Sequence, residues 1–484
     1  MRFRALLLST LLILTGCTAA SEPAPTLEGA VEDQVLAWED CDGGFECAVI
    51  FAPLDWMSDT GEYVQLKLMR KSGTSELQPI LANPGGPGSS AIKWLRDGYE
   101  TTGSSWFREN FQIVVFDPRG VGESTAVICE DNQLKDELLY GQPKFEIGSE
   151  EDIADSKEQI AKFAQSCQRQ GPSVAYFNTQ QTARDMDLIR SLFGMEQLNF
   201  LGFSYGTELG ATYAALFPQR VGKFVLDGAV DPTLDSSTAL LGQINGFDKA
   251  LRAYLEDCLK QTDCPFSGSV DDAMTTIAGF LQAREARALP TNEERELGIS
   301  ATIAGMIVTL YSQESWIYLT QAFQQGLAGD GSLFLILADF YNDRNPEGGY
   351  STNINEANIA ISCADNVVKP KSLERLDEIR SASKVFGRYY AYPDIGCTGW
   401  PEGIGMIPLN YQVELSNKPM IVGTTGDPAT PYEQAVSLAE LLGGKLVTLR
   451  GEGHTAYGSN TCVTSIVDAY LEGTDLGTST LNCL

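Results

Sequence analysis

The chain has 484 residues, of which 43% are hydrophobic and 20% are charged, as in an ordinary globular protein. This length allows a large core and two or three domains, or one domain with a large insertion. The formal net charge of -30 argues against a nucleic-acid-binding protein, because phosphate recognition requires a basic surface.

The N-terminus has the pattern of an export signal. Arg2 and Arg4 precede an apolar run over residues 5–14, which is too short for a mature membrane span but suits a signal peptide. Residues 14–17 (LTGC) resemble the lipobox of bacterial lipoproteins, in which the cysteine carries lipid. We therefore expect a signal peptide and lipobox over residues 1–17, a lipid anchor to the cell-envelope membrane at Cys17 and a flexible tether over residues 18–30. The alternative is a secreted protein without the anchor.

The cysteine content also favours export. Besides Cys17 the chain has ten cysteines, so up to five disulfides are plausible. Sequence leaves the pairing open, but closeness along the chain suggests Cys41–Cys47, Cys129–Cys167, Cys258–Cys264, Cys363–Cys397 and Cys462–Cys483. The chain has one histidine and no C-x-x-C pair, so we expect no zinc site of the usual spacing.

Short apolar segments alternate with helical patterns from residue 31 to residue 231. Val64–Leu68 alternates apolar and polar residues, which predicts a half-buried strand, whereas Phe111–Phe116 is continuously apolar, like a central strand of a parallel sheet. Other segments of this part predict strands at Pro79–Ala82 and Lys223–Leu226, a helix at Thr182–Phe193 and a strand, turn and helix over Leu198–Pro218. This alternation predicts a doubly wound, mostly parallel sheet with ligands at the carboxyl ends of its strands.

Residues 232–401 show almost only helical periodicity. We expect helices at Ile244–Leu259, Asp271–Ala288, Ile299–Tyr311, Trp316–Leu327 and Ser372–Phe386. The α/β pattern resumes over residues 402–484, with strands at Pro419–Gly423 and Lys445–Leu449 and helices at Tyr432–Leu442 and Thr464–Leu471. A helical insertion of this size between strands predicts a cap over the site at the strand ends.

The segment Leu198–Pro218 contains G-x-S-x-G, formed by Gly202, Ser204 and Gly206. In such an elbow a nucleophilic serine sits on a strained turn between a strand and a helix, and small residues flank it because the two backbones nearly touch. The helix N-terminus favours the negative charge that develops when the serine attacks a carbonyl. Ser204 is therefore the candidate nucleophile.

A nucleophilic serine needs a base, and the usual base is a histidine held by a carboxylate. His454 is the one histidine of the chain, and it directly follows a predicted strand near the C-terminus. In the chain order serine, acid, histidine, Asp427 fits best, because it lies on the turn-rich loop after the strand Met420–Gly423, 27 positions before His454. Asp227 and Asp231, which follow the strand before, are the rival acids.

Two backbone N–H groups are needed to bind the oxyanion. One is expected from Tyr205, which follows the nucleophile, and the other from the Gly-rich loop NPGGPGSS, where we choose Gly86. The loop lacks the Gly-Lys-Ser/Thr ending of a phosphate loop.

Together these motifs identify a family resemblance that covers most of the mature chain. CDGGFECAVIFAPLDW, NPGGPGSS, VVFDPRGVGES, GFSYGTELG, GTTGDPATP and GEGHTAYG resemble the exported α/β-hydrolases related to tripeptidyl and prolyl aminopeptidases. The resemblance implies an α/β-hydrolase fold and a monomeric serine exopeptidase that needs no cofactor. Pro84 stands where prolyl aminopeptidases usually have histidine, which favours the tripeptidyl type. A cell-envelope carboxylesterase or lipase-like enzyme and a catalytically inactive binding lipoprotein are the alternatives.

An enzyme that acts on free peptide N-termini must recognise an ammonium group, and a carboxylate in a dry cavity does so well. Three acidic residues near the nucleophile are available for this contact: Glu208, Asp227 and Asp231. Glu208 lies one helical turn after Ser204. The expected partner is therefore a peptide substrate.

Overall fold

The computed structural model describes residues 30–129, 132–168, 173–366, 372–390, 393–477 and 481–484. The expected signal peptide, Cys17 and all of the tether except Ala30 lie outside the described residues. Among the helices of the described ranges, none combines the length and the apolar character that a membrane crossing needs.

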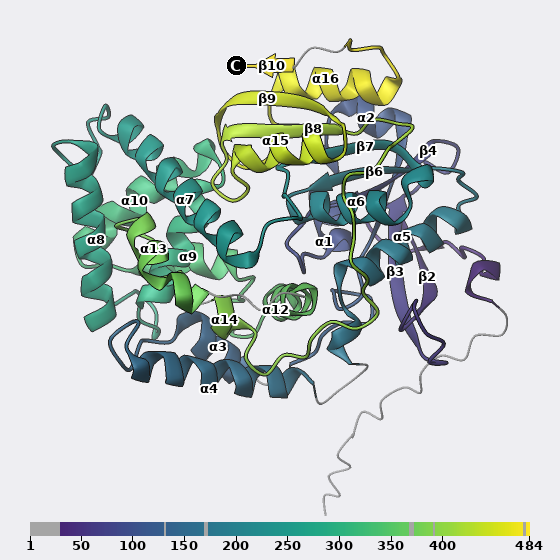
Figure 1. Ribbon diagram of the computed structural model, residues 1–484. Coiled ribbons are helices and arrows are strands. Elements are labelled where there is room, and N and C mark those ends of the chain that lie inside the picture. The colour runs from purple at the N-terminus through teal and green to yellow at the C-terminus, as the bar shows by residue number, and fades with distance from the viewer. Residues whose placement is uncertain (1–29, 130–131, 169–172, 367–371, 391–392, 478–480) are drawn as a thin grey trace, which may run out of the picture.

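The described residues form a ten-stranded sheet with the order β1-β2-β3-β5-β4-β6-β7-β8-β9-β10 (Figure 1). Neighbouring strands run antiparallel from β1 to β5 in this order and parallel from β5 to β10, so the predicted mostly parallel sheet is confirmed. The strands are β1 (Glu39–Asp40), β2 (Phe45–Pro53), β3 (Tyr63–Lys71), β4 (Gln78–Asn83), β5 (Phe111–Phe116), β6 (Leu198–Phe203), β7 (Val221–Asp227), β8 (Met420–Gly426), β9 (Lys445–Glu452) and β10 (Leu481–Cys483).

Helices cover both faces of the sheet, which explains why β5 is apolar except at Gln112. Val114 and Phe116 of β5 belong to the core cluster that contains α5 (Thr179–Leu192), α6 (Tyr205–Leu216) and α15 (Tyr432–Leu441). Ile113 and Val115 belong to the opposite cluster, with α1 (Ala91–Gly98), α2 (Ser105–Asn110) and α16 (Thr461–Glu472). Successive side chains of a strand point to opposite faces, so a strand with both faces covered is apolar at most of its positions.

Between β7 and β8 the described chain is helical and has a hydrophobic core of its own. Its helices are α7 (Ser236–Cys258), α8 (Val270–Ala286), α9 (Ile299–Leu310), α10 (Trp316–Leu327), α11 (Ser332–Tyr341), α12 (Ile354–Asp365), α13 (Leu376–Ala382) and α14 (Pro393–Gly396). Figure 1 shows this insertion as a separate mass beside the sheet, with α3 (Asn132–Tyr140) and α4 (Glu150–Cys167) beneath it. The domain boundaries at residues 231 and 401 stay predictions.

Local capping explains two differences from the predicted helices. α5 begins three residues before the predicted start because the Asn178 side chain accepts a hydrogen bond from the Gln181 N–H. The predicted helix Ser372–Phe386 is instead a 3₁₀ turn at Ser372–Arg375 followed by α13, which ends before Ser383. The Ser383 hydroxyl accepts hydrogen bonds from the next backbone N–H groups and so replaces the helical pattern there.

All five disulfides suggested by closeness along the chain are present. They join Cys41–Cys47, Cys129–Cys167, Cys258–Cys264, Cys363–Cys397 and Cys462–Cys483. Such a set is typical of proteins that fold in an oxidising compartment, which agrees with export.

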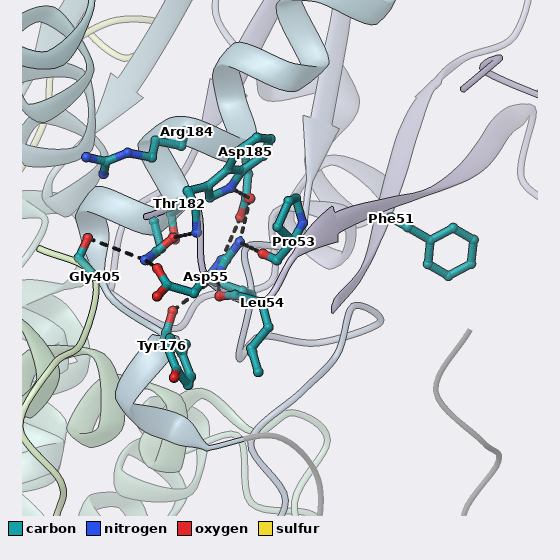
Figure 2. A network of polar contacts seen from close by, with 12 residues as sticks. Phe51, Pro53, Leu54, Asp55, Tyr176, Thr182, Arg184, Asp185 and Gly405 are labelled. Atoms are coloured by element: carbon teal, nitrogen blue, oxygen red, sulfur yellow. Dashed lines mark hydrogen bonds and ion pairs between the residues drawn. The ribbon is translucent and has the colours of Figure 1, made fainter. Parts of the chain in front are cut away.

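A buried ion pair links the loop after β5, the helix α5 and the end of β2 (Figure 2). Arg119 and Asp185 of α5 are both fully buried and form two hydrogen bonds of 2.6 and 2.8 Å. Arg119 also donates to the carbonyls of Pro53 and Leu54 at the end of β2, and the Trp56 indole donates to Asp185. Because its remaining donors also have acceptors, the guanidinium is well compensated for its loss of water.

We predict that Asp185→Asn destabilises the protein by about 3–5 kcal/mol, because the variant leaves Arg119 buried without its counter-charge. Urea unfolding followed by circular dichroism measures the free energy of unfolding. The control is Glu123→Gln, which removes an exposed ion pair with Arg96 and is expected to cost about 0–1 kcal/mol. Equal stability of the two variants would show that the buried pair does not hold the core together.

Candidate active site

Ser204 lies at the sharp turn between β6 and α6. Its backbone has φ 54° and ψ −125°, a conformation that a residue with a side chain adopts at a cost of about 1–3 kcal/mol. Two hydrogen bonds hold the turn: the Ser204 N–H donates to the Asp227 carbonyl at 2.9 Å, and the Thr207 hydroxyl donates to the Ser204 carbonyl at 2.6 Å. The turn therefore has the geometry of a nucleophile elbow.

Glycines allow this turn because neighbouring backbones leave no room for side chains. A Cβ atom on Gly202 would lie 2.4 Å from the Gly206 carbonyl oxygen, and one on Gly206 would lie 2.8 Å from the Asn83 carbonyl oxygen. β6, α6 and the end of β4 thus meet backbone to backbone around Ser204. This contact explains why the sequence has glycine two residues before and two residues after the serine.

His454 and Asp427 form a hydrogen-bonded pair beyond the ends of β9 and β8. The His454 Nδ1 atom lies 2.9 Å from both carboxylate oxygens of Asp427. Asp427 is buried and also accepts hydrogen bonds from the N–H groups of Ala429 and Thr430 and from the Thr430 hydroxyl. These donors fix the carboxylate, which in turn orients the ring and directs Nε2 away from Asp427.

The insertion supports the His454 backbone. The His454 N–H donates to the carbonyl of Tyr311, the residue that follows α9, at 2.8 Å. The Tyr311 ring also packs edge-on against the imidazole, with 5.3 Å between ring centroids. The position of the histidine thus depends on a contact with a residue 143 positions earlier in the chain.

The surroundings of His454 change its affinity for protons. Burial lowers the pKa of the imidazole, but the charge and the hydrogen bond of Asp427, with a further contribution from Asp227, outweigh burial. The net effect raises the pKa of His454 above its ordinary value of 6.5. A ring that gains a proton readily is suited to accept one from a nucleophile.

Asp227, the first rival acid, contacts the backbone of the histidine loop. Its Oδ2 atom accepts hydrogen bonds from the N–H groups of Ala456 and Tyr457 at 2.9 and 2.7 Å. Its other carboxylate oxygen is buried and has no partner among the described residues, and burial is the main cause that raises its pKa to about 6. Asp227 thus joins the strand end beside Ser204 to the loop of His454.

Asp231, the second rival acid, is buried in a local network. One carboxylate oxygen accepts hydrogen bonds from the backbone and hydroxyl of Thr233, and the other accepts from the Ser437 hydroxyl. Among the described residues this network includes neither His454 nor Ser204. The carboxylate that the structure brings to the histidine ring is therefore that of Asp427.

The Gly-rich loop lies against the elbow. A Cβ atom on Gly85 would lie 2.9 Å from the Ser204 Cβ atom and 3.2 Å from the Tyr205 nitrogen. The Gly85 N–H donates to the Asn83 side chain at 2.9 Å, whereas the Gly86 N–H donates to no acceptor in the described chain. Tyr205 is the first residue of α6, so its N–H has no carbonyl partner within the helix.

Glu208 lies on α6 one turn beyond the nucleophile. The residue keeps part of its surface accessible, yet burial and then the neighbouring charge of Asp365 raise the pKa of its carboxyl group to about 8. Glu208 forms no hydrogen bond or ion pair with another described residue.

Three residues that contact the site, Thr430, Tyr311 and Asp365, were not predicted from the sequence. Thr430 lies three residues after Asp427, a spacing that is typical of turns closed by an aspartate side chain. Its hydrogen bonds to Asp427 could therefore have been predicted from the sequence. Tyr311 and Asp365 belong to the insertion, far from the motifs, and no local pattern marks them. Asp365 accepts hydrogen bonds from the Thr179 N–H and hydroxyl, and the Thr179 and Tyr205 hydroxyls lie 2.5 Å apart.

Several known proteins are similar to this chain over most of its length. Serine protease Hip1 of Mycobacterium tuberculosis is 32% identical over 97% of this chain and 95% of its own length. Carboxylesterase B of the same species is 32% identical (90% and 86%), and tripeptidyl aminopeptidase of Streptomyces coelicolor is 30% identical (91% and 84%). The family model of the alpha/beta hydrolase fold matches residues 78–461. The chain therefore belongs to the α/β-hydrolase family.

Proposed function

We propose that this protein is a serine peptidase that releases short peptides from the free N-terminus of peptide substrates. The observation that carries the proposal is the His454–Asp427 pair, with 2.9 Å between Nδ1 and either carboxylate oxygen, in a fold that also presents Ser204 on a strained elbow. Similarity to serine protease Hip1 and to tripeptidyl aminopeptidase over most of the chain supports the peptidase reading.

In the proposed reaction Ser204 Oγ attacks the scissile carbonyl while His454 Nε2 accepts the hydroxyl proton. Asp427 holds the ring and stabilises its positive charge. The N–H groups of Gly86 and Tyr205 bind the negative oxygen of the tetrahedral intermediate. The C–N bond then breaks as His454 gives its proton to the leaving amine, and water hydrolyses the acyl-enzyme by the same steps.

Glu208 is the acid that we assign to the substrate ammonium. Asp227 and Asp231 are equal candidates from sequence, but Asp227 is fully buried and one of its oxygens binds the histidine loop, while Asp231 is buried and binds Thr233 and Ser437. Glu208 has no such partner, lies on the helix of the nucleophile and has a raised pKa. An arriving ammonium would supply the missing counter-charge and stabilise the ionised carboxylate.

The second candidate is an esterase of the same fold, which the similarity to carboxylesterase B favours. An ester substrate needs no ammonium contact, so Glu208 would then be a buried acid without a partner. A catalytically inactive binding lipoprotein is the third candidate. It gives no reason for the Asp427–His454 contact.

We also propose that the protein acts as a lipid-anchored monomer at the cell envelope. The lipobox-like residues 14–17 and the resemblance to exported enzymes support this location, and the five disulfides agree with export.

Ser204→Ala is expected to lower hydrolysis by about 10³- to 10⁶-fold without unfolding the protein, because one member of the catalytic unit is lost. A fluorophosphonate probe should label the wild type and fail to label the variant. Unchanged turnover in Ser204→Ala would refute a serine mechanism, and a wild type that does not react with the probe would favour the binding lipoprotein.

Asp427→Asn is expected to reduce turnover by about 10⁴-fold and to leave KM almost unchanged. The base must be neutral, so wild-type activity falls as the pH drops through the raised pKa of His454, above 6.5. The variant lacks the charge that raises this pKa, and its residual activity should persist to lower pH. Steady-state pH profiles measure both effects, and an unshifted profile would count against Asp427 as the partner of the base.

Glu208→Gln is expected to raise KM about 10- to 100-fold for a tripeptide arylamide with a free amine, as a charge-assisted hydrogen bond is lost. KM for the N-acetylated tripeptide and for a p-nitrophenyl ester should change little. Since the pKa of Glu208 is about 8, wild-type KM for the free amine should fall as the pH rises toward 8.

The control for this experiment is Glu433→Gln, which removes an exposed acid from α15. It should leave all three substrates unaffected. If the wild type cleaves the blocked peptide as well as the free one, or only the ester, the aminopeptidase proposal is wrong and the esterase is the better reading.

A further inference from the structure

Helix α12 belongs to the insertion but touches the Gly-rich loop that follows β4. The Asn358 side chain on α12 donates a hydrogen bond of 3.0 Å to the carbonyl of Pro87. Pro87 directly follows Gly86, whose N–H is the proposed oxyanion donor. In Figure 1 α12 is seen nearly end-on, between the helices of the insertion and those beside the sheet.

The loop and the helix pack too closely for a side chain to fit between them. A Cβ atom on Gly88 would lie 2.7 Å from the Ile354 carbonyl oxygen and 2.8 Å from the Asn358 nitrogen, both on α12. Gly88 has φ +96°, which also favours glycine. The α12 backbone therefore packs directly against the Gly-rich loop at Gly88.

α12 is itself firmly held on two sides. At its start the Asn353 side chain donates to the carbonyls of Gly120 and Val127 and accepts from the Gly122 N–H. In its first turn Glu356 forms a buried ion pair of 2.5 Å with Lys135 of α3. These contacts hold α12 in place independently of the Gly-rich loop, so the helix can support the loop.

We propose that Asn358 is a positioning residue that holds the Gly86 N–H where the oxyanion forms, an inference that rests on the proposed serine mechanism. The loop contains glycines at 85, 86 and 88 and is free to adopt other conformations unless its carbonyls are fixed. The Asn358 hydrogen bond fixes the carbonyl of Pro87, the residue that follows the proposed donor Gly86. Donors fixed in advance stabilise the transition state because they need no rearrangement during the reaction.

The test compares Asn358→Ala with Asn355→Ala. Asn355 lies on the same helix and also donates to a backbone carbonyl, but to that of Asn342 within the insertion. Loss of an oxyanion donor costs about 10²- to 10³-fold in kcat, so a displaced donor should cost about tenfold. We expect Asn358→Ala to lower kcat and the rate of fluorophosphonate labelling about tenfold, and KM and the thermal midpoint to match those of Asn355→Ala.

A second variant, Asn358→Asp, separates the hydrogen bond from the volume of the side chain. It keeps the shape but replaces the donor by an acceptor, so it should lower the labelling rate at least as much as Asn358→Ala. It also provides the measurement if the alanine variant does not fold.

The outcomes distinguish the two proposals. A wild type that the probe does not label overturns the serine mechanism itself. A wild type that is labelled, with Asn358 variants that react as fast as Asn355→Ala, overturns the positioning role alone. An effect on KM without an effect on kcat or labelling would likewise overturn it, because the residue would then act on substrate binding.

Discussion

The strained backbone of Ser204 depends on a contact that only glycine allows. β6 and α6 approach so closely that a side chain at 202 or 206 would overlap backbone atoms of the helix or of β4. This contact lets the chain turn sharply at Ser204 and leaves the serine partly accessible at the end of the sheet. The hydrophobic clusters on both faces of the sheet hold the strand and the helix in place and so balance the local strain.

Asp227 connects the elbow to the rest of the site. Its carbonyl accepts the Ser204 N–H, and its carboxylate accepts two N–H groups of the loop that carries His454. Asp227 is the last residue of β7, but the hydrogen-bond partner of the His454 ring is Asp427. The negative charge of Asp227 also contributes to the raised pKa of His454, so Asp227 affects His454 both through the backbone of its loop and through its charge.

The helical insertion is part of the site rather than a simple cover. Tyr311 accepts the backbone N–H of His454, Asn358 donates to the Gly-rich loop, and Asp365 binds Thr179 beside the Tyr205 hydroxyl. The first contact reaches His454, the second reaches the residue after Gly86, and the third reaches a residue that contacts the Tyr205 side chain. A movement of the insertion would therefore disturb the His454 backbone, the Gly-rich loop and the surroundings of the Tyr205 side chain.

Local sequence was sufficient wherever the relevant physics is local. The apolar run of β5, the glycines around Ser204 and the short spacings between cysteines predicted the parallel core, the elbow and the disulfides. Helix α4 was not predicted, because its first half is mostly polar and its buried residues are confined to its second half. Helix α12 lies within the predicted helical insertion, but its bounds were not predicted.

The sequence by itself determined which chemical groups are present: one serine on an elbow, one histidine, a small set of acids and a loop rich in glycine. Only the tertiary structure decided their contacts. Chain order favours Asp427 over Asp227 and Asp231, but all three lie at or after strand ends, and sequence does not show which carboxylate contacts the ring. Folding distinguished them, because a buried carboxylate is directed by the donors around it, and those donors come from segments far apart in the chain.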